Sequence, residues 1–242
     1  MPKGWQTPVG TQLQLPSART AAAQAIRESI ISGELKGGDR ILEQKWAVRL
    51  GIGQPTLREG LQELEHQGLL RKIPQRGTYV TQLSPTDYRL IQEVRIPLEA
   101  IAVGKATKNI TPESERELTD LVMNMAGGGN SVIDVKSFHD NDVAFHRKIW
   151  TLAENEYLAD TLESITFRLF VFSIVGRWPD NPDALVERVA AVQQHLGILE
   201  GIKSHDPHTA SLTFIRKTVH YWNTQYGLGL NEEELLLTAP RG

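Results

Sequence analysis

Three short segments near the start of the chain carry apolar residues at helical spacing. Their apolar sets are, in order, Ala22, Ile26 and Ile30; Leu42, Trp46 and Leu50; and Leu57, Leu61 and Leu64. Residues three or four positions apart lie on one face of a helix, so each segment is predicted to be helical. The third helix is expected to begin near Pro55, because a proline at the first helical position costs no hydrogen bond, and to end at Gly68.

A β-hairpin is predicted directly after the third helix. Residues 69–73 and 78–82 are strand candidates on either side of a turn that contains Pro74 and Gly77. Only Gly51 to Gln54 separate the second and third helices, which is the spacing of a helix-turn-helix motif. Residues 17–83 are therefore predicted to form a winged helix-turn-helix domain, and the polar residues 1–16 a flexible arm.

The pattern beyond Leu83–Pro85 is helical nearly throughout. The predicted helices span residues 87–108, 113–126, 134–153, 156–177, 182–204 and 207–227. Glycine, proline and asparagine separate them, and no strand-like alternation competes. The expected fold class is mainly α: a winged helix-turn-helix followed by an all-α bundle over residues 84–228, with residues 229–242 as a mobile tail.

The charge of the chain is divided unequally between these two parts. The 242 residues carry a formal net charge of -3 and no cysteine, and 40% of them are hydrophobic, as in ordinary globular proteins. Residues 1–83 carry 11 basic and 7 acidic side chains, a net of +4, so the remaining 159 carry a net of -7. A basic domain joined to an acidic one indicates a polyanion partner for the first domain. No signal peptide or membrane segment is recognisable, so a cytoplasmic protein is expected.

The stretch ILEQKWAVRLGIGQPTLREGLQELEHQGLLRKIPQRGTYV resembles the winged helix-turn-helix of GntR-type transcription regulators. The resemblance covers about residues 20–82 and includes both core helices and the R-G-x-x-V end of the wing. It implies binding of double-stranded operator DNA through the second helix, the start of the recognition helix and the wing tip. The DNA-binding residues expected from it are Gln44, Lys45, Gln54, Thr56, Arg58, Arg76 and Gly77.

This chain departs from the family pattern at three of its DNA-facing positions. Gln44 and Gln54 stand where the family often has arginine, and Gly53 stands where it has serine. Fewer charges predict a shallower dependence of DNA binding on salt. A surface salt bridge between Arg58 and a glutamate of its own helix, Glu59 or Glu63, is the alternative role for that arginine.

A carboxylate and three imidazoles lie on three of the predicted bundle helices. Asp142 and His146 are one turn apart on a single face, and His195 and His220 lie on later helices. Imidazole and carboxylate together suit a divalent metal ion, although a histidine hydrogen-bonded inside a bundle is the plainer alternative. His139, His205 and His208 are expected to face solvent.

The motif D-x-x-F-H, followed by Q-H-x-x-I-L-E-x-I, resembles the FCD ligand-binding domain of the FadR subfamily of GntR regulators, as does the helix EVRIPLEAIAV. The resemblance implies a divalent metal, zinc ahead of nickel or manganese, bound by Asp142, His146, His195 and His220. The last histidine of the family would fall near Lys217, so His220 serves only if the helix register is shifted.

The same resemblance implies a small carboxylate effector that completes the metal coordination. An arginine would bind the far end of this effector, with Arg95 as first choice and Arg168 and Arg147 after it. A structural ion pair is the alternative role for each arginine.

The expected function is a ligand-responsive regulator, a repressor, that binds DNA as a homodimer and is not an enzyme. A metal-dependent hydrolase using the His/Asp site is the alternative in a different class, because metal-bound water is a nucleophile. A winged helix that serves only protein contacts is the third.

Overall fold

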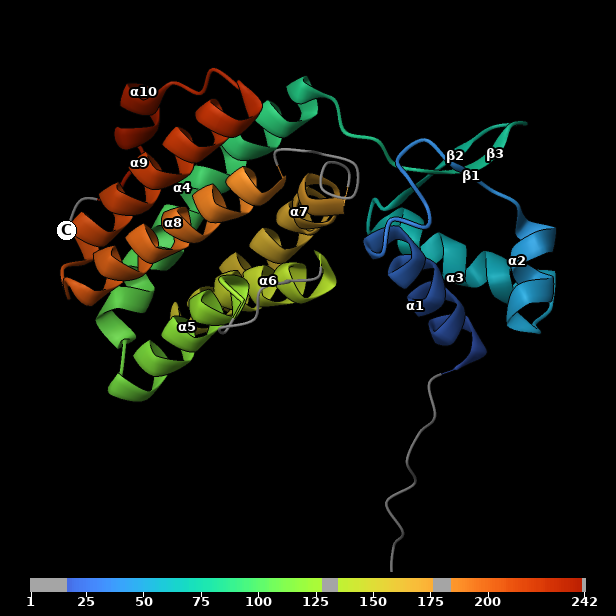
Figure 1. The fold of residues 1–242 in the computed structure, drawn as a ribbon, viewed down its shortest axis with the longest axis horizontal. Helices are drawn as coiled ribbons and strands as arrows, with labels where there is room; N and C mark the ends of the chain where they lie inside the picture. Colours follow the sequence, from blue (N-terminus) through green and yellow to red (C-terminus); the bar gives the residue numbers. More distant parts are fainter. Residues whose placement is uncertain (1–16, 128–134, 176–183, 241–242) are drawn as a thin grey trace, which may run out of the picture.

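The structure is a computed structural model, and it describes residues 17–127, 135–175 and 184–240. The described chain forms two groups of elements, a small one with the only sheet found there and a larger helical bundle (Figure 1). The arm expected over residues 1–16 lies outside the described residues.

The first group is built from three helices and three short strands. Its elements are α1 (Ala18–Ile31), β1 (Arg40–Ile41), α2 (Glu43–Leu50), α3 (Gln54–His66), β2 (Leu70–Ile73) and β3 (Gly77–Val80). Leu57, Leu61 and Leu64 are buried, as expected from their spacing. Gly60 allows α1 to approach α3 closely, because a Cβ there would lie 3.0 Å from the Arg19 carbonyl oxygen.

The wing contains one strand more than the sequence predicts. The sheet order is β1-β3-β2, and both pairings are antiparallel, with Arg40 opposite Tyr79 and Arg71 also opposite Tyr79 on the other side. Strand β1 has only two residues, which is too short for alternation to be visible in a sequence. The chain turns at Gln75 and Gly77, whose φ angles are 62° and 109°.

The second group is a helical bundle in which α4 packs against α6, α7 and α9. Its helices are α4 (Pro85–Asn109), α5 (Pro112–Met125), α6 (Val135–Leu152), α7 (Glu156–Val175), α8 (Ala184–Lys203), α9 (Pro207–Tyr226) and α10 (Glu232–Leu236). Three of them start in the same way: Ser84, Thr111 and Asp206 cap the helix, and each precedes a proline. The side-chain oxygen accepts from a backbone N–H two or three residues into the helix, and the proline needs no acceptor.

The chain after α9 is packed, where a mobile tail was expected for residues 229–242. Helix α10 contacts α9 and α4, and Leu228, Leu230, Leu235 and Ala239 are buried. Asn223 on α9 holds this segment through hydrogen bonds to the backbone N–H and carbonyl of Leu230. The burial of these few apolar residues was not predicted, because they lack helical spacing in the sequence.

Helix α7 joins the bundle to the winged helix-turn-helix. Val171 and Phe172 belong to the apolar core of the first group, with Phe167 packed against it, although all three lie on a bundle helix. Phe170, between them, faces the bundle core instead. Figure 1 shows α7 on the side of the bundle that faces α1 and the sheet. The two groups therefore share a hydrophobic contact as well as the connection before α4.

Replacing Phe172 by alanine is expected to lower the free energy of unfolding by about 3 kcal/mol, since truncating a buried phenylalanine leaves a cavity. The side chain is 5% exposed, whereas Tyr157 on the same helix is 78% exposed. Tyr157→Ala is therefore the control and should change stability by less than about 0.5 kcal/mol. Urea unfolding measures both, and an unchanged midpoint in Phe172→Ala would contradict the shared core.

Candidate DNA interface and metal centre

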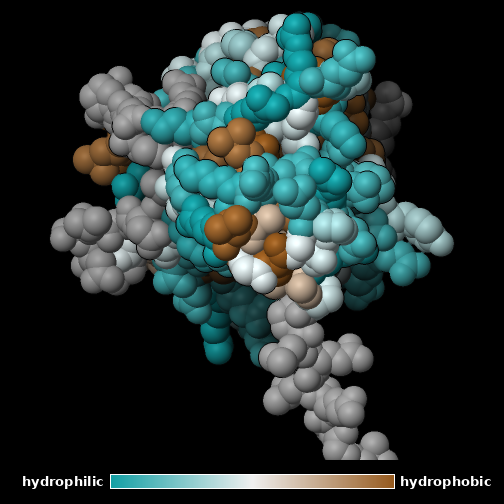
Figure 2. Space-filling view, turned by 90° about the vertical axis from the view of Figure 1, so that its right-hand side faces the viewer, coloured by the Kyte–Doolittle hydropathy of each residue, from teal (hydrophilic) through white to brown (hydrophobic). Residues whose placement is uncertain are grey.

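The residues expected to read DNA lie on the surface of α2, α3 and the wing. Gln44 and Lys45 are exposed on α2, Gln54 and Arg58 are exposed on α3, Thr56 is half-buried, and Arg76 is exposed beside Gly77. Figure 2 views the molecule from the winged-helix end, and this face is largely hydrophilic with small separate apolar patches. Exposed polar side chains at the start of a recognition helix have the placement that readout of base edges requires.

Arg58 is held by an acidic residue of α2. Its Nε donates to Oε2 of Glu43 at 2.7 Å, so its partner is neither Glu59 nor Glu63. The Arg58 side chain is 60% exposed, and an exposed pair of this kind contributes at most about 1 kcal/mol. Glu43 therefore orients the guanidinium at the surface and releases it at low cost.

Arg40 is a wing residue that the sequence did not single out. It pairs across from Tyr79, and its guanidinium lies against Gly77, where a Cβ would be 3.2 Å from Arg40 Nε. Because Arg76 is exposed next to Gly77, the wing carries two neighbouring cations. The strand β1 that positions Arg40 gave no sequence signal, so this contribution was missed.

Three of the four expected metal ligands converge inside the bundle. Asp142 and His146 on α6 and His195 on α8 are buried, and one ligand atom of each lies within 4.8 Å of the other two. The His195 Nε2 to Asp142 Oδ1 distance is 2.8 Å, the two Nε2 atoms are 3.3 Å apart, and His146 Nε2 is 3.8 Å from Asp142 Oδ1. Ligands of a tetrahedral zinc ion are about 3.3 Å apart, so these spacings fit a divalent cation.

The hydrogen bonds of the two imidazoles support this fit. His146 Nδ1 lies 2.6 Å from Glu99 Oε1, and His195 Nδ1 lies 2.7 Å from the Ala191 carbonyl oxygen. Both partners are acceptors, so each Nδ1 carries a proton. In the neutral form of each ring, Nε2 then has the lone pair with which it could bind a cation beside the Asp142 carboxylate. Two lone pairs and a carboxylate directed at one point favour a bound cation.

Glu99 is the central residue of the shell around these ligands, and it was not among the site residues expected from the sequence. Its carboxylate is fully buried and accepts from Arg95 Nε at 2.8 Å, from His146 Nδ1 and from Trp150 Nε1 at 2.9 Å. Burial opposes ionisation, but the charges of Arg95 and His146 and the hydrogen bonds outweigh it and lower the pKa of Glu99 to about 2. A carboxylate behind a ligand histidine fixes its orientation and its tautomer.

The pKa values of Asp142 and His146 also depend on the balance between burial and the neighbouring charges and hydrogen bonds. Burial raises the pKa of Asp142, yet the hydrogen bond and charge of His195 lower it below its ordinary value. Burial lowers the pKa of His146, despite the opposing effect of Glu99. An ionised carboxylate beside a neutral imidazole is the protonation state that binds a cation.

His220 is not brought to this site, and its assignment as a ligand was wrong. It is exposed on α9, and Lys217 is also exposed, with its aliphatic stem against Gly197. The α9 residues that line the cavity beside the ligands are Tyr221, Trp222 and Tyr226. The expected shift of helix register is absent, so α9 supplies aromatic rings in place of an imidazole.

Of the three arginines considered for an effector, only Arg95 lies at the metal centre. It is 2% exposed, lines the cavity, and its guanidinium carbon lies 5.2 Å from the centre of the Phe170 ring. Arg147 instead pairs with Glu163, and Arg168 packs against Gly68 of the first group, so neither reaches the cavity. Both lie where the bundle meets the winged helix-turn-helix.

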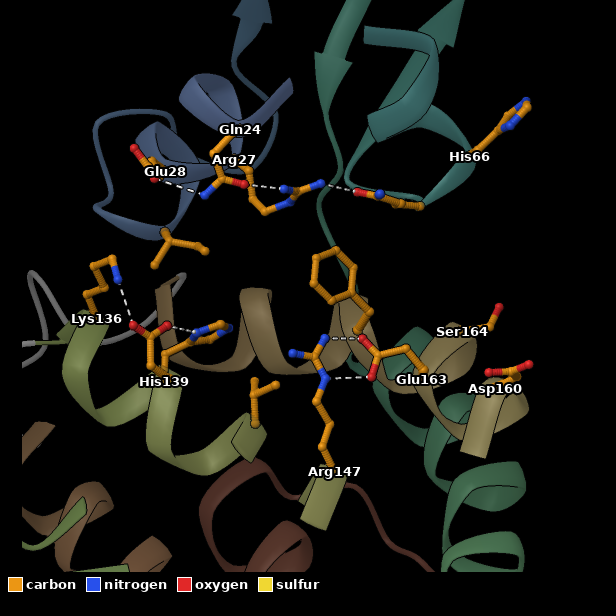
Figure 3. Close-up of a pocket in the computed structure, with 15 residues that line it drawn as sticks. Gln24, Arg27, Glu28, His66, Lys136, His139, Arg147, Asp160, Glu163 and Ser164 are labelled. Atoms are coloured by element: carbon orange, nitrogen blue, oxygen red, sulfur yellow. Dashed lines mark hydrogen bonds and ion pairs between the residues drawn. The ribbon is translucent and has the colours of Figure 1, made fainter. Parts of the chain in front are cut away.

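Arg147 and Glu163 form part of a cleft of about 870 Å³ between α1, α6 and α7 (Figure 3). Arg27 crosses the opposite wall, where it donates to Gln24 and to Gln67. His139 also lines this cleft but is 5% exposed, which corrects the expectation that it faces solvent. It lies on the same side of α6 as Asp142, one turn earlier, a spacing that would have indicated burial.

Comparison with known proteins assigns both parts of the chain. The FCD domain family matches residues 90–216, and the family of bacterial regulatory proteins described as gntR matches residues 18–80. The chain belongs to the GntR family of transcription regulators and carries an FCD domain. It is thus a DNA-binding regulator, and its relatives give no support to a hydrolase.

Individual relatives agree with this assignment. The HTH-type transcriptional regulator YdhC of Bacillus subtilis (strain 168) is 27% identical over 189 residues, which cover 76% of this chain and 80% of the relative. The HTH-type transcriptional repressor RspR of Escherichia coli (strain K12) is 23% identical over 183 residues, covering 75% and 77%. The solved structure of E. coli McbR/YncC has the same fold, with a TM-score of 0.71 and 20% identity over 88% of this chain and 99% of that one.

Arg58→Ala in this GntR regulator is expected to weaken binding to its operator by about 1–3 kcal/mol, the value of one good base contact. Fluorescence anisotropy at fixed salt measures the effect. Arg89→Ala is the matched control, because Arg89 is exposed and paired with Glu93 on α4, away from the recognition helix. An equal loss on unrelated DNA would show that Arg58 contacts phosphate and does not read a base.

Glu99→Gln is expected to flatten the acid limb of the stability curve of the metal-free protein. Ionised Glu99 stabilises the fold fully above its ordinary pKa of 4.5, and this contribution is lost as pH falls toward the folded pKa of about 2. The glutamine variant lacks that contribution, so its free energy of unfolding should be lower at pH 6 and change less between pH 4.5 and 2. Urea titrations at several pH values test this. Glu163→Gln, at a half-exposed pair, should follow the wild type.

Proposed function

We propose that this protein is a metal-dependent, ligand-responsive repressor of the FadR subfamily, in which a small carboxylate bound at the Asp142–His146–His195 centre changes operator binding. The observation that carries the proposal is that α7 contacts both the metal centre and the DNA-binding domain. Phe170 lines the cavity beside the ligands, whereas Phe172, two residues later, is buried in the winged-helix core.

The chemistry of the candidate metal centre suits a carboxylate ligand. A cation held there, zinc ahead of nickel or manganese, would offer positive charge and open coordination positions to a carboxylate. The chain provides three ligands, which leaves at least one position for the effector. Arg95 adds a buried positive charge beside them, although Glu99 already binds it.

The size of the cavity supports a link between binding and movement. The space beside the ligands is about 30 Å³, enough for about one or two water molecules. A carboxylate effector needs more room, so the rings that line the cavity must move when it binds. Because close-packed interiors transmit such displacements, a shift of Phe170 would reach the winged-helix core through Val171 and Phe172.

Dimer formation belongs to the same proposal. A homodimer would read a two-fold operator with two equivalent winged helices. Leu90 and Val94, one turn apart on α4, are 50% and 52% exposed and provide an apolar strip of the kind that a second copy covers. Repression is favoured as the sign because the relative RspR is a repressor.

The decisive experiment compares Asp142→Ala with His220→Ala. Wild-type protein and His220→Ala should each retain about one divalent ion per chain by elemental analysis, and Asp142→Ala should retain none. A screen of small carboxylates should raise the melting temperature of the first two only, and the acid that does so should weaken operator binding. By linkage, operator DNA must weaken binding of that acid by the same factor.

Two outcomes would contradict the proposal in different ways. Metal retained by Asp142→Ala would show that the ion binds elsewhere. An acid that binds at the centre and leaves operator affinity unchanged would show that the domain is not the sensor.

A further inference from the structure

The positive charge of the winged helix-turn-helix domain is concentrated on its wing. Residues 43–66, which contain α2 and α3, carry three basic and four acidic side chains, a net of -1. The strands and turn of the wing, residues 40–41 and 70–80, carry four basic side chains and no acidic one. These four wing cations equal the whole net charge of +4 of residues 1–83, and they are Arg40, Arg71, Lys72 and Arg76.

The arginines of α2 and α3 are already paired, whereas the wing cations are not. Arg58 on α3 pairs with Glu43 at 2.7 Å, and Arg49 on α2 pairs with Glu34. All four wing cations are exposed, and none of them has an ion-pair partner among the described residues. Affinity for DNA comes largely from cations placed near phosphates, so the wing has the charge that such contacts need.

The register of the strands places two of the wing cations on the same face of the sheet. Arg40 on β1 and Arg71 on β2 both lie opposite Tyr79 of the central strand β3. Residues directly opposite each other in antiparallel strands project from the same face. Thr78 and Val80, on either side of Tyr79, are buried, so the row of Arg40, Tyr79 and Arg71 lies on the outer face. Neighbouring strands are about 4.8 Å apart, which makes this row about 10 Å wide.

The outer row is continuous with the tip of the wing. The Tyr79 hydroxyl donates to the Arg76 carbonyl oxygen at 3.2 Å. The Arg40 guanidinium lies over the backbone of Gly77, where a Cβ would be 3.2 Å from Nε and 3.3 Å from Nη2. Arg76 precedes Gly77 and is exposed, and the wing extends away from the bundle (Figure 1). Three arginines therefore cover the path from β2 to the tip.

We propose that this outer face of the wing is the main phosphate-binding surface of the protein, and that it follows the backbone of duplex DNA beside the bases read by α3. The family resemblance assigned only the wing tip, Arg76 and Gly77, whereas the face proposed here adds Arg40 and Arg71. Phosphate contacts supply affinity that does not depend on sequence, and the polar residues at the start of α3 supply discrimination. Three phosphates neutralised by one wing predict a slope of about −2.7 in the logarithm of affinity against the logarithm of salt concentration.

The test uses the full chain and a duplex of about 30 base pairs of arbitrary sequence, because phosphate contacts do not require the operator. Fluorescence anisotropy measures the dissociation constant at salt concentrations from about 50 to about 200 mM, a range over which phosphate contacts change affinity strongly. Arg71→Ala and Arg40→Ala should each weaken binding about tenfold at the lowest salt and reduce the slope by about one unit for each wing bound.

Matched variants separate a phosphate contact from other effects of the substitution. Arg71→Lys keeps the positive charge and should keep the wild-type slope, since a lysine also binds phosphate. Arg19→Ala removes an exposed arginine that pairs with Glu63 at the start of α1, on the side of the domain away from the wing (Figure 1), and should leave the slope unchanged. Urea midpoints should match that of the wild type, because these side chains are exposed. Arg71→Gln takes the place of Arg71→Ala if the alanine variant has a lower midpoint.

Three results would overturn the inference: a slope unchanged in Arg71→Ala and Arg40→Ala, an equal loss in Arg19→Ala, or a slope lost in Arg71→Lys as well. The second would show that only the overall charge of the domain matters. An unchanged slope combined with weaker self-association of Arg71→Ala would show that this face contacts a second copy of the chain. None of these measurements involves the metal centre, so they test the wing separately from the proposed effector site.

Discussion

The centre of the bundle depends on the hydrogen bonds that the buried carboxylate of Glu99 accepts. A fully buried charge is tolerated only when it is paired and hydrogen-bonded, and Glu99 achieves this with three donors from two helices. The requirement sets α4 beside α6 at one register and directs His146 Nε2 toward Asp142 and His195. It also engages Arg95, which keeps a second buried charge neutralised in the absence of any ligand. An ion-pair network of the chain itself therefore holds the candidate metal ligand His146 in place.

Helix α7 places a second constraint on the molecule. Successive side chains on it serve two different cores, because Leu169 and Phe170 belong to the bundle while Val171 and Phe172 belong to the winged helix-turn-helix. A helix is stiff over this length, so the two cores cannot repack independently around it. Because Phe170 lines the small cavity beside the candidate ligands, a change in the packing of that cavity would affect both cores through α7.

The sequence predicted the helices well and the site incompletely, for physical reasons that differ between residues. Capping residues before proline and breakers after each apolar run carry local information, so α4 to α9 were located within a few residues, whereas the short α10 was not predicted. His220 shares its residue type with true ligands, but its exposure depends on how α9 rotates against α8, which no local pattern encodes. Arg147 and Arg168 were grouped with Arg95 by charge alone, and only the packing of α7 separates them.

The sequence pattern also failed to identify three buried polar residues, Glu99, Gln92 and His139. Each is a polar residue at an inward position of a helix, where the pattern of apolar residues alone counts it as an interruption. Glu99 has hydrogen-bond partners on α4 and α6, whereas Gln92 and the Nε2 atom of His139 have none among the described residues. Whether an inward polar residue is paired depends on which side chains of the neighbouring helices lie opposite it, and the spacing of residues along one helix does not contain that information.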